Sequence, residues 1–180
     1  MLGILIAMNA SSSLAEVNTL ATQTAIGVWH IAGDFLIVIL LLAVLFLFAW
    51  YVGRGPFVGV LLALYTAYAV YSIFPFMSYL PSGPPATSTL AHIGLYAVLT
   101  IIFYIILRRV VVSDFLYIGV FGLVVLSLLG AGFIIAVLYH TFSITTVYQF
   151  TPTIDLFFAP TEYFFWWFVG PAIGLFFLAR

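Results

Sequence analysis

The stretch DFLIVILLLAVLFLFAWYVGRGP, Asp34 to Pro56, decides the fold of this chain. No charged residue stands between Asp34 and Arg54, and a transmembrane helix needs about 20 consecutive, mostly apolar residues to cross a hydrocarbon core of ~30 Å. The stretch ends in Gly-Arg-Gly-Pro, which combines helix-breaking residues with a charge that lipid excludes. It therefore predicts a membrane-spanning helix that stops just before Arg54.

The composition extends this prediction to the whole chain. Of 180 residues, 66% are hydrophobic and 5% are charged, whereas soluble domains carry roughly 25% charged residues. Breakers divide the chain into five apolar stretches, so we expect an all-α, polytopic membrane helix bundle with spans at 26–51, 57–80, 88–109, 114–140 and 161–179. Residues 26–180 would form this single bundle, and residues 1–25 an outer segment with a short interfacial helix.

The fifth stretch is the most irregular one. Thr151 and Pro152 have the residue types of a helix N-cap and first turn, which predicts a short helix or re-entrant piece around 152–158. The apolar stretch that follows contains Gly170 and Pro171, so it either spans with a kink or turns back, and its length favours spanning.

The composition also excludes several classes of function. A net charge of −1 gives no basic surface for nucleic acid. The absence of cysteine excludes thiolate metal sites and cysteine nucleophiles, and the absence of lysine excludes a Schiff-base cofactor. No HExxH motif or Ser/Lys pair of the expected kind is present, so an intramembrane enzyme is the less favoured class. We predict no cofactor.

The arginines predict the orientation. If all five stretches span, every arginine falls on one side of the membrane: Arg54, Arg108, Arg109 and Arg180. Short loops that carry Lys or Arg stay in the cytoplasm, so the N-terminus is expected outside and the C-terminus inside. We expect the cytoplasmic membrane of a bacterium or archaeon.

Two ionisable residues open the first span. His30 and Asp34 are four residues apart, so they share one helix face. Asp34 lies about 12 Å along the span at about 1.5 Å per residue, where a lone carboxylate would cost at least ~2.5–3.5 kcal/mol. It should therefore be protonated, paired or turned towards a wet cavity. A structural hydrogen bond is the favoured interpretation, and a pair that shares one proton is the alternative.

Further ionisable residues fall in the outer half, His92 near the start of the third span and Glu162 at the start of the fifth. The proton- or cation-coupling candidates are His30, Asp34, His92 and Glu162. Three of them, His30, Asp34 and His92, have ligand types that suit a transition metal, but their spacing specifies none and no metal site is predicted. A polar stripe on the second span would either meet Asp34 or, as we favour, pack against other helices: Tyr65, Tyr68, Ser72 and Tyr79.

The fourth span is predicted to pack closely against other helices. Its small residues recur at spacings that let backbones approach one another, and this packing interface comprises Ser127, Gly130, Ala131, Gly132 and Ala136. We expect this span at the centre of the bundle or at a subunit interface. The run EYFFWWF at 162–168 indicates an aromatic belt at the outer head-group level rather than a cofactor or sugar site.

Two hypotheses for the function follow. The first is a subunit, assembly factor or scaffold of a membrane complex, because the chain has no soluble domain, no catalytic motif and few polar residues. Its partners would be the bilayer and either another membrane protein or a second copy of the chain. The alternative is a proton- or cation-coupled carrier or channel that uses the outer His/Asp cluster.

Overall fold

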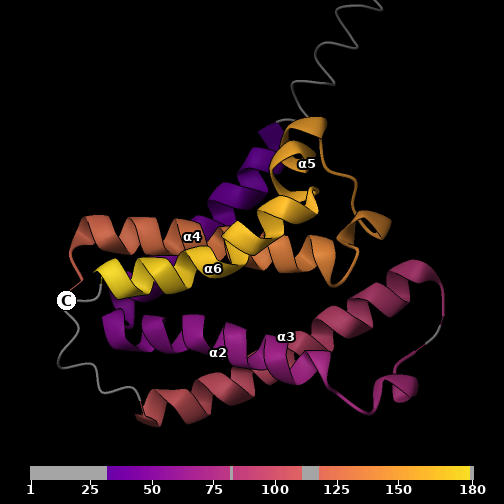
Figure 1. Cartoon of the computed structure of the whole chain (residues 1–180), viewed down its shortest axis with the longest axis horizontal. Coiled ribbons are helices and arrows are strands. Elements are labelled where there is room, and N and C mark those ends of the chain that lie inside the picture. Colours follow the sequence, from indigo (N-terminus) through magenta and orange to yellow (C-terminus); the bar gives the residue numbers. More distant parts are fainter. Residues whose placement is uncertain (1–31, 82, 111–117, 179–180) are drawn as a thin grey trace, which may run out of the picture. The chain divides into compact units, whose positions relative to one another are not determined.

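The computed structural model of the protein describes residues 32–81, 83–110 and 118–178, and all regular secondary structure in these residues is helical. Five helices are long and apolar enough to cross a membrane, which confirms the predicted all-α bundle (Figure 1). They are Ala32–Tyr51, α2 (Arg54–Ser72), α3 (Pro85–Val110), α4 (Val120–His140) and α6 (Thr161–Leu178). Three short elements lie in the connections: η1 (Met77–Tyr79), η3 (Ile144–Thr146) and α5 (Pro152–Phe158).

The chain divides into two compact units, Met1–Ile37 and Val38–Arg180. Of the first unit only residues 32–37 are described. The predicted interfacial helix within 1–25 lies outside the described residues, as do the beginnings of the first and fourth predicted spans. The architecture below is that of the second unit.

Helices α2 and α3 form an antiparallel hairpin. The Tyr96 hydroxyl donates to the Leu64 carbonyl at 3.0 Å, and the Tyr71 hydroxyl lies 2.9 Å from Nδ1 of His92. Residues further along α2 therefore meet residues earlier in α3. In consequence, the Arg54 end of α2 lies beside the last turn of α3, which carries two arginines.

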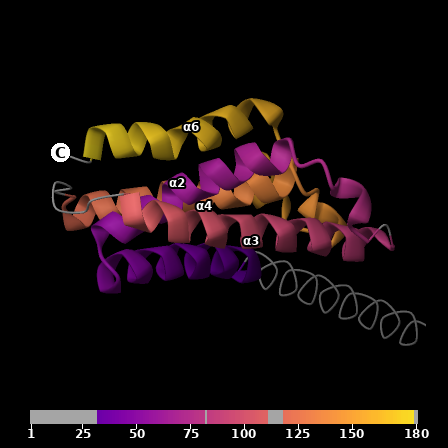
Figure 2. The ribbon, with the colours of Figure 1, turned by 90° about the horizontal axis from the view of Figure 1, so that it is seen from below.

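Helices α4 and α6 form a second antiparallel pair (Figure 1). Gly132 lies against the ring of Trp167, and Gly174 faces Leu126, so the order of contacts is reversed along the two helices. In the view of Figure 2 the axes of the long helices of this unit are roughly aligned. The chain direction alternates from one helix to the next, as successive membrane spans require.

The two pairs meet through α2 and α4. Leu61 lies against Gly130, and the ring of Tyr65 packs on Phe133 with centroids 4.7 Å apart. We compare how many of the 18 most apolar consecutive residues of each helix are buried. The buried share is 61% in α4 and 50% in α2, but only 6% in α3 and in α6. The core therefore lies between α2 and α4, and the other helices present most of their surface outwards.

The predicted boundaries of the second span, 57–80, are wrong at both ends. Helix α2 begins at Arg54 because Gly53, with φ 114°, adopts a conformation that suits glycine, and because Pro56 is tolerated in a first turn. It ends at Ser72, since Pro75 disfavours the helical conformation of the residue before it. The backbone N–H groups at 73 and 74 instead close tighter, three-residue turns onto the carbonyls at 70 and 71.

The predicted polar stripe is shortened by this early end. Tyr79 lies in η1 and is 83% exposed, so it does not continue the row of Tyr65 and Tyr68. Ser72 bonds to the Ala69 carbonyl of its own helix at 2.7 Å. The third span also begins earlier than predicted, at Pro85 rather than at residue 88.

The short helix predicted at 152–158 is confirmed as α5, with Thr151 as its N-cap residue and Pro152 in its first turn. The Thr151 carbonyl accepts from the N–H groups of Ile154 and Asp155 at 3.0 and 3.1 Å. Helix α6 then runs from residue 161 to residue 178 through Pro171 without turning back.

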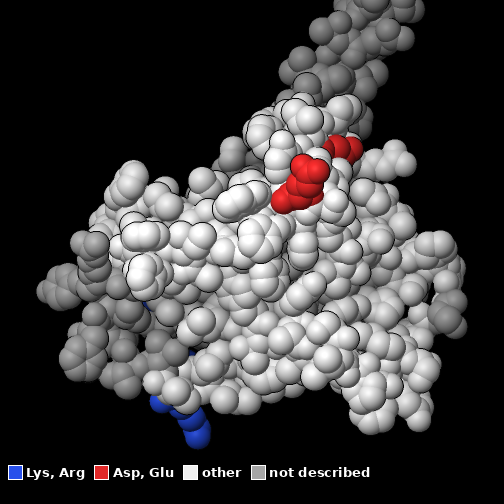
Figure 3. Space-filling model, in the orientation of Figure 1, with Lys and Arg blue, Asp and Glu red and all other residues white. Residues whose placement is uncertain are grey.

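Charged groups gather at two separate places on the surface of this unit. Figure 3 shows acidic side chains where α5 meets α6, and basic side chains at the end of the unit where α3 finishes. The described exposed or half-buried acids are Asp155 and Glu162, and the described arginines are Arg54, Arg108 and Arg109.

Candidate functional site

The residues predicted to couple protons or cations do not form one described site. His30 lies outside the described residues. Asp34 belongs to the Met1–Ile37 unit and is 1% exposed, whereas His92 and Glu162 belong to the other unit. Within the described part of the chain, no three His, Cys, Asp or Glu residues are close enough to hold a metal ion.

His92 is held at the junction of α2 and α3. Its Nδ1 bonds to the Tyr71 hydroxyl, and the two rings meet edge to face with centroids 6.2 Å apart. Tyr71 packs in turn on Phe142, just beyond α4, at 5.0 Å. Thr89 lies near His92 in α3, and its hydroxyl is 3.1 Å from that of Thr146, which joins α3 to η3. These contacts fasten the end of the α2–α3 hairpin to the segment that follows α4.

His140, at the end of α4, contacts α5. Its Nε2 lies 2.8 Å from the Phe158 carbonyl, and because a carbonyl only accepts, Nε2 carries the proton. The preceding residue, Tyr139, donates its hydroxyl to Oδ1 of Asp155 at 2.7 Å. Two adjacent residues of α4 thus hold the middle and the last residue of α5. Sequence analysis did not find the Tyr139–Asp155 bond, because nothing in the local pattern relates residues so far apart.

Glu162 is exposed in the first turn of α6. There its negative charge lies near the positive end of the helix dipole, which is a favourable placement. This position gives the carboxylate a structural role at the start of α6.

The small residues predicted as a packing interface are all buried: Ser127, Gly130, Ala131, Gly132 and Ala136. A Cβ at Gly132 would overlap the six-membered ring of Trp167, and one at Gly130 would come within 2.8 Å of Leu61. Their close approach therefore serves helices of the same chain. The hydroxyl of Ser127 is buried without a hydrogen-bond partner among the described residues.

A tyrosine from α2 compensates for the proline inside α6. Pro171 has no N–H and disturbs the hydrogen-bond ladder of its helix. The Tyr65 hydroxyl donates to the Phe168 carbonyl, and the N–H of Ala172 bonds to the same hydroxyl. Inside a membrane, backbone groups that a proline disturbs need such a partner. Tyr65 thereby joins α2 to the middle of α6.

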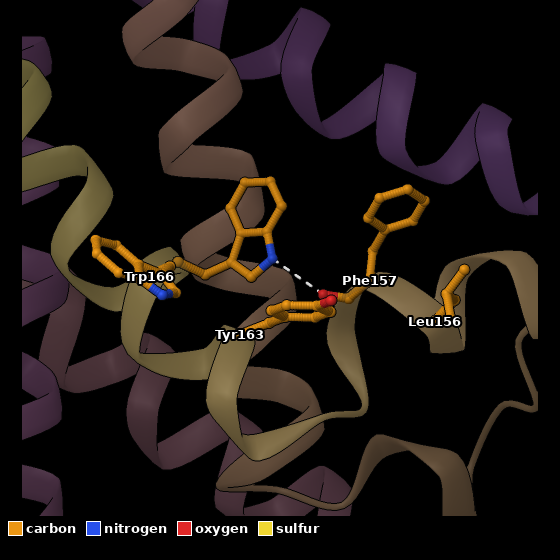
Figure 4. Close-up of a pocket in the computed structure, with 5 residues that line it drawn as sticks. Leu156, Phe157, Tyr163 and Trp166 are labelled. Atoms are coloured by element: carbon orange, nitrogen blue, oxygen red, sulfur yellow. Dashed lines mark hydrogen bonds between the residues drawn. The ribbon is translucent and has the colours of Figure 1, made fainter.

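A pocket of about 410 Å³ opens between α5 and α6 (Figure 4). Its lining is almost wholly aromatic: Leu156, Phe157, Tyr163, Trp166 and Trp167. The indole N–H of Trp167 donates to the Phe157 carbonyl at 3.1 Å, which fixes the two helices to each other. A smaller pocket of about 230 Å³ lies beside Trp50, Arg54 and Leu123.

Comparison of the chain with protein-family models, curated proteins and solved structures finds no match. Its function is therefore argued from its own residues.

Proposed function

We propose that the protein is a subunit or scaffold of a membrane complex that works through helix contacts. Three of the described polar side chains that a substrate could use are engaged in joining segments of the chain. His92 bonds to Tyr71, His140 to the Phe158 carbonyl, and Asp155 to Tyr139. With these groups engaged inside the chain, the surface left for a function is the outward face of the helices.

The observation that carries the proposal is a notch on the outward face of α3. Gly94 and Ala97 are exposed and three residues apart, so they share a helix face. A Cβ added at Gly94 would contact nothing within 4 Å. Exposed Val98 and Ile101 flank the notch on the same face. Small residues between branched ones allow another helix to approach closely in lipid, where tight packing drives association.

Cross-linking tests this proposal directly, because the chain contains no natural cysteine. Ala97→Cys should form an oxidative cross-link in native membranes, and Ala172→Cys, at an exposed position of α6, should not. A product of twice the chain's mass identifies a second copy, and any other mass identifies a different protein.

The apparent mass of the complex should also depend on the notch in α3. Gly94→Leu fills the notch and should lower the apparent mass of the complex on native gels, whereas Ala172→Leu should leave it unchanged. The proposal is wrong if the wild-type chain runs as a monomer, or if Gly94→Leu leaves the complex intact.

The proposed setting is the cytoplasmic membrane of a bacterium or archaeon, with the N-terminus outside and the arginines at the cytoplasmic face. The shared position of Arg54 and the last turn of α3 at one end of the hairpin supports this orientation. An impermeant maleimide should label Ser78→Cys in intact cells and should label Arg54→Cys only after lysis. Labelling of Arg54→Cys from outside would reverse the orientation.

A second candidate function is a proton- or cation-coupled carrier or channel, and the burial of Asp34 favours it. An ionisable residue inside a membrane-spanning helix is a candidate for function by default. Asp34→Asn keeps the shape but cannot cycle a proton. It should assemble normally yet abolish pH-driven flux in proteoliposomes; unchanged flux in this variant excludes the coupling role.

A further inference from the structure

The pocket between α5 and α6 has the form of an aromatic cage. Tyr163 and Trp166 expose their rings on two sides, being 46% and 65% exposed. Trp167 is half-buried and forms the inner wall of the pocket. Its ring stacks on the buried ring of Phe158, with centroids 5.0 Å apart. Phe157 of α5 closes another side (Figure 4). The volume of about 410 Å³ falls within the roughly 300–1,000 Å³ of small-molecule sites.

The charge around this cage is negative. Glu162 precedes Trp166 by four residues, so both side chains lie on one face of α6. Asp155 of α5 adds a second negative charge to this end of the unit, although its Oδ1 accepts from the Tyr139 hydroxyl of α4. The described basic side chains lie at the other end of the unit, as Figure 3 shows. The positive end of the α6 dipole, about +0.5 charge, offsets the Glu162 carboxylate only in part, so a net negative charge remains beside the cage.

Aromatic rings attract cations electrostatically within about 6 Å of the ring centre, and cages of such rings recognise quaternary ammonium groups. Tyrosine and tryptophan also mark the head-group level of a membrane, where lipid head groups are the most abundant ligands. We propose that this pocket binds the choline head group of a phospholipid, with its trimethylammonium group against the rings of Tyr163 and Trp166 and with Glu162 as the counter-charge. The hydrocarbon chains of the lipid then lie along the exposed face of α6.

The recognition is specific in a way that an apolar groove is not. Apolar walls alone would accept a tert-butyl group as readily as trimethylammonium, since the two have nearly the same shape. Ring faces and a carboxylate distinguish them by charge. The phenol O–H of Tyr163 and the indole N–H of Trp166 supply the donors that a lipid phosphate accepts.

The test compares two lipids that differ in one atom. The full-length protein in maltoside micelles is offered equal amounts of dioleoylphosphatidylcholine and its 3,3-dimethylbutyl analogue, in which carbon replaces the quaternary nitrogen. Native mass spectrometry then counts the lipids that remain bound. The wild type should retain the choline lipid roughly two- to five-fold better, the range that an exposed cation–π contact provides.

Two variants locate this preference. Trp166→Leu keeps the wall apolar but removes a ring, and Glu162→Gln removes the charge while keeping the shape; both should bring the ratio close to one. Trp50→Leu is the matched control, because Trp50 is a tryptophan of similar exposure, 56%, outside this pocket. It should leave the ratio unchanged.

Two results would overturn the proposal. Equal retention of both lipids by the wild type would mean that the pocket takes apolar groups regardless of charge. A preference that survives Trp166→Leu and Glu162→Gln would mean that choline binds elsewhere. Both positions are exposed, so Trp166→Leu should change the unfolding temperature little, and Glu162→Gln should lower it only by the loss of the favourable interaction with the helix dipole. Should Trp166→Leu fail to fold, Glu162→Gln alone decides. The outcome is independent of the helix contact proposed for α3.

Discussion

Replacing Gly132 by alanine should destabilise the protein through a single contact. The added methyl group would overlap the six-membered ring of Trp167. The ring cannot swing aside freely, because it stacks on Phe158 with centroids 5.0 Å apart and its N–H bonds to the Phe157 carbonyl at 3.1 Å. The overlap must therefore push α4 and α6 apart or break the attachment of α5.

The size of the effect follows from these alternatives. Overpacking a well-filled core costs typically ~1–3 kcal/mol, and breaking the indole hydrogen bond instead would cost about 0.5–1.5 kcal/mol. Alanine regains about 0.5–1 kcal/mol over glycine in a helix. We expect Gly132→Ala to lower the free energy of unfolding by about 1–2 kcal/mol.

Gly130→Ala is the matched control in the same helix. Its methyl group would meet the Cδ2 atom of Leu61 at 2.8 Å, but this is the end of a flexible side chain that can rotate away. The expected change is below about 1 kcal/mol, since a small shift of one terminal methyl suffices. The two glycines are two residues apart, so local helix propensity affects both alike.

Unfolding by sodium dodecyl sulfate in mixed micelles, followed by helix content, measures both variants. Combining Gly132→Ala with Trp167→Leu should remove most of the cost of the alanine, because the clashing ring is gone. If Gly132→Ala is as stable as Gly130→Ala, or if the double variant shows no coupling, α4 and α6 do not meet through this pair and the reasoning is refuted.

Three further predictions concern single polar groups. Ser127→Ala should leave stability unchanged or raise it by up to about 1–3 kcal/mol in the same unfolding assay, because it removes a buried hydroxyl without a described partner; a clear loss would contradict this. Tyr65→Phe should cost about 0.6 kcal/mol and speed hydrogen exchange at Ala172, next to the proline in α6, while exchange in α3 stays unchanged. Tyr139→Phe removes the bond to Asp155 and should cost about 1.5–3 kcal/mol, with faster proteolysis around α5 as the readout; equal proteolysis would show that this bond does not hold α5 in place.

Local signals predicted local features well. A short helix around residues 152–158 could be predicted because Thr151 and Pro152 act on their own turn, through one carbonyl and one missing N–H. The end of α2 was misjudged because hydropathy continues beyond Ser72, whereas the conformational restriction imposed by Pro75 ends the helix. A backbone constraint on one residue overrides the hydropathy of its neighbours.

The candidate site shows the limit of such signals. That His92 would need a hydrogen-bond partner follows from its place in a span, but that the partner is Tyr71 depends on the register of the α2–α3 hairpin. The same holds for Tyr139 and Asp155, which come together only because the connection after α4 brings α5 back to the last turn of α4. The cage around Trp166 likewise needs α5 beside α6, although the aromatic run alone suggests a belt.

The sequence by itself determined that this protein belongs in a membrane and that the described residues contain five long apolar helices. Stretches of about 20 apolar residues have no stable alternative to spanning as helices, because the bilayer core offers no partner for backbone groups. Small-residue spacing predicted a packing face for α4, but which helices pack on that face, and which faces of the other helices are buried, was decided only by the tertiary structure. Lipid is as apolar as a protein core, so hydropathy does not distinguish α4, mostly buried, from α3, mostly exposed. Close packing at Gly130 and Gly132 buries this face of α4, and such packing depends on the shapes of both helices that meet.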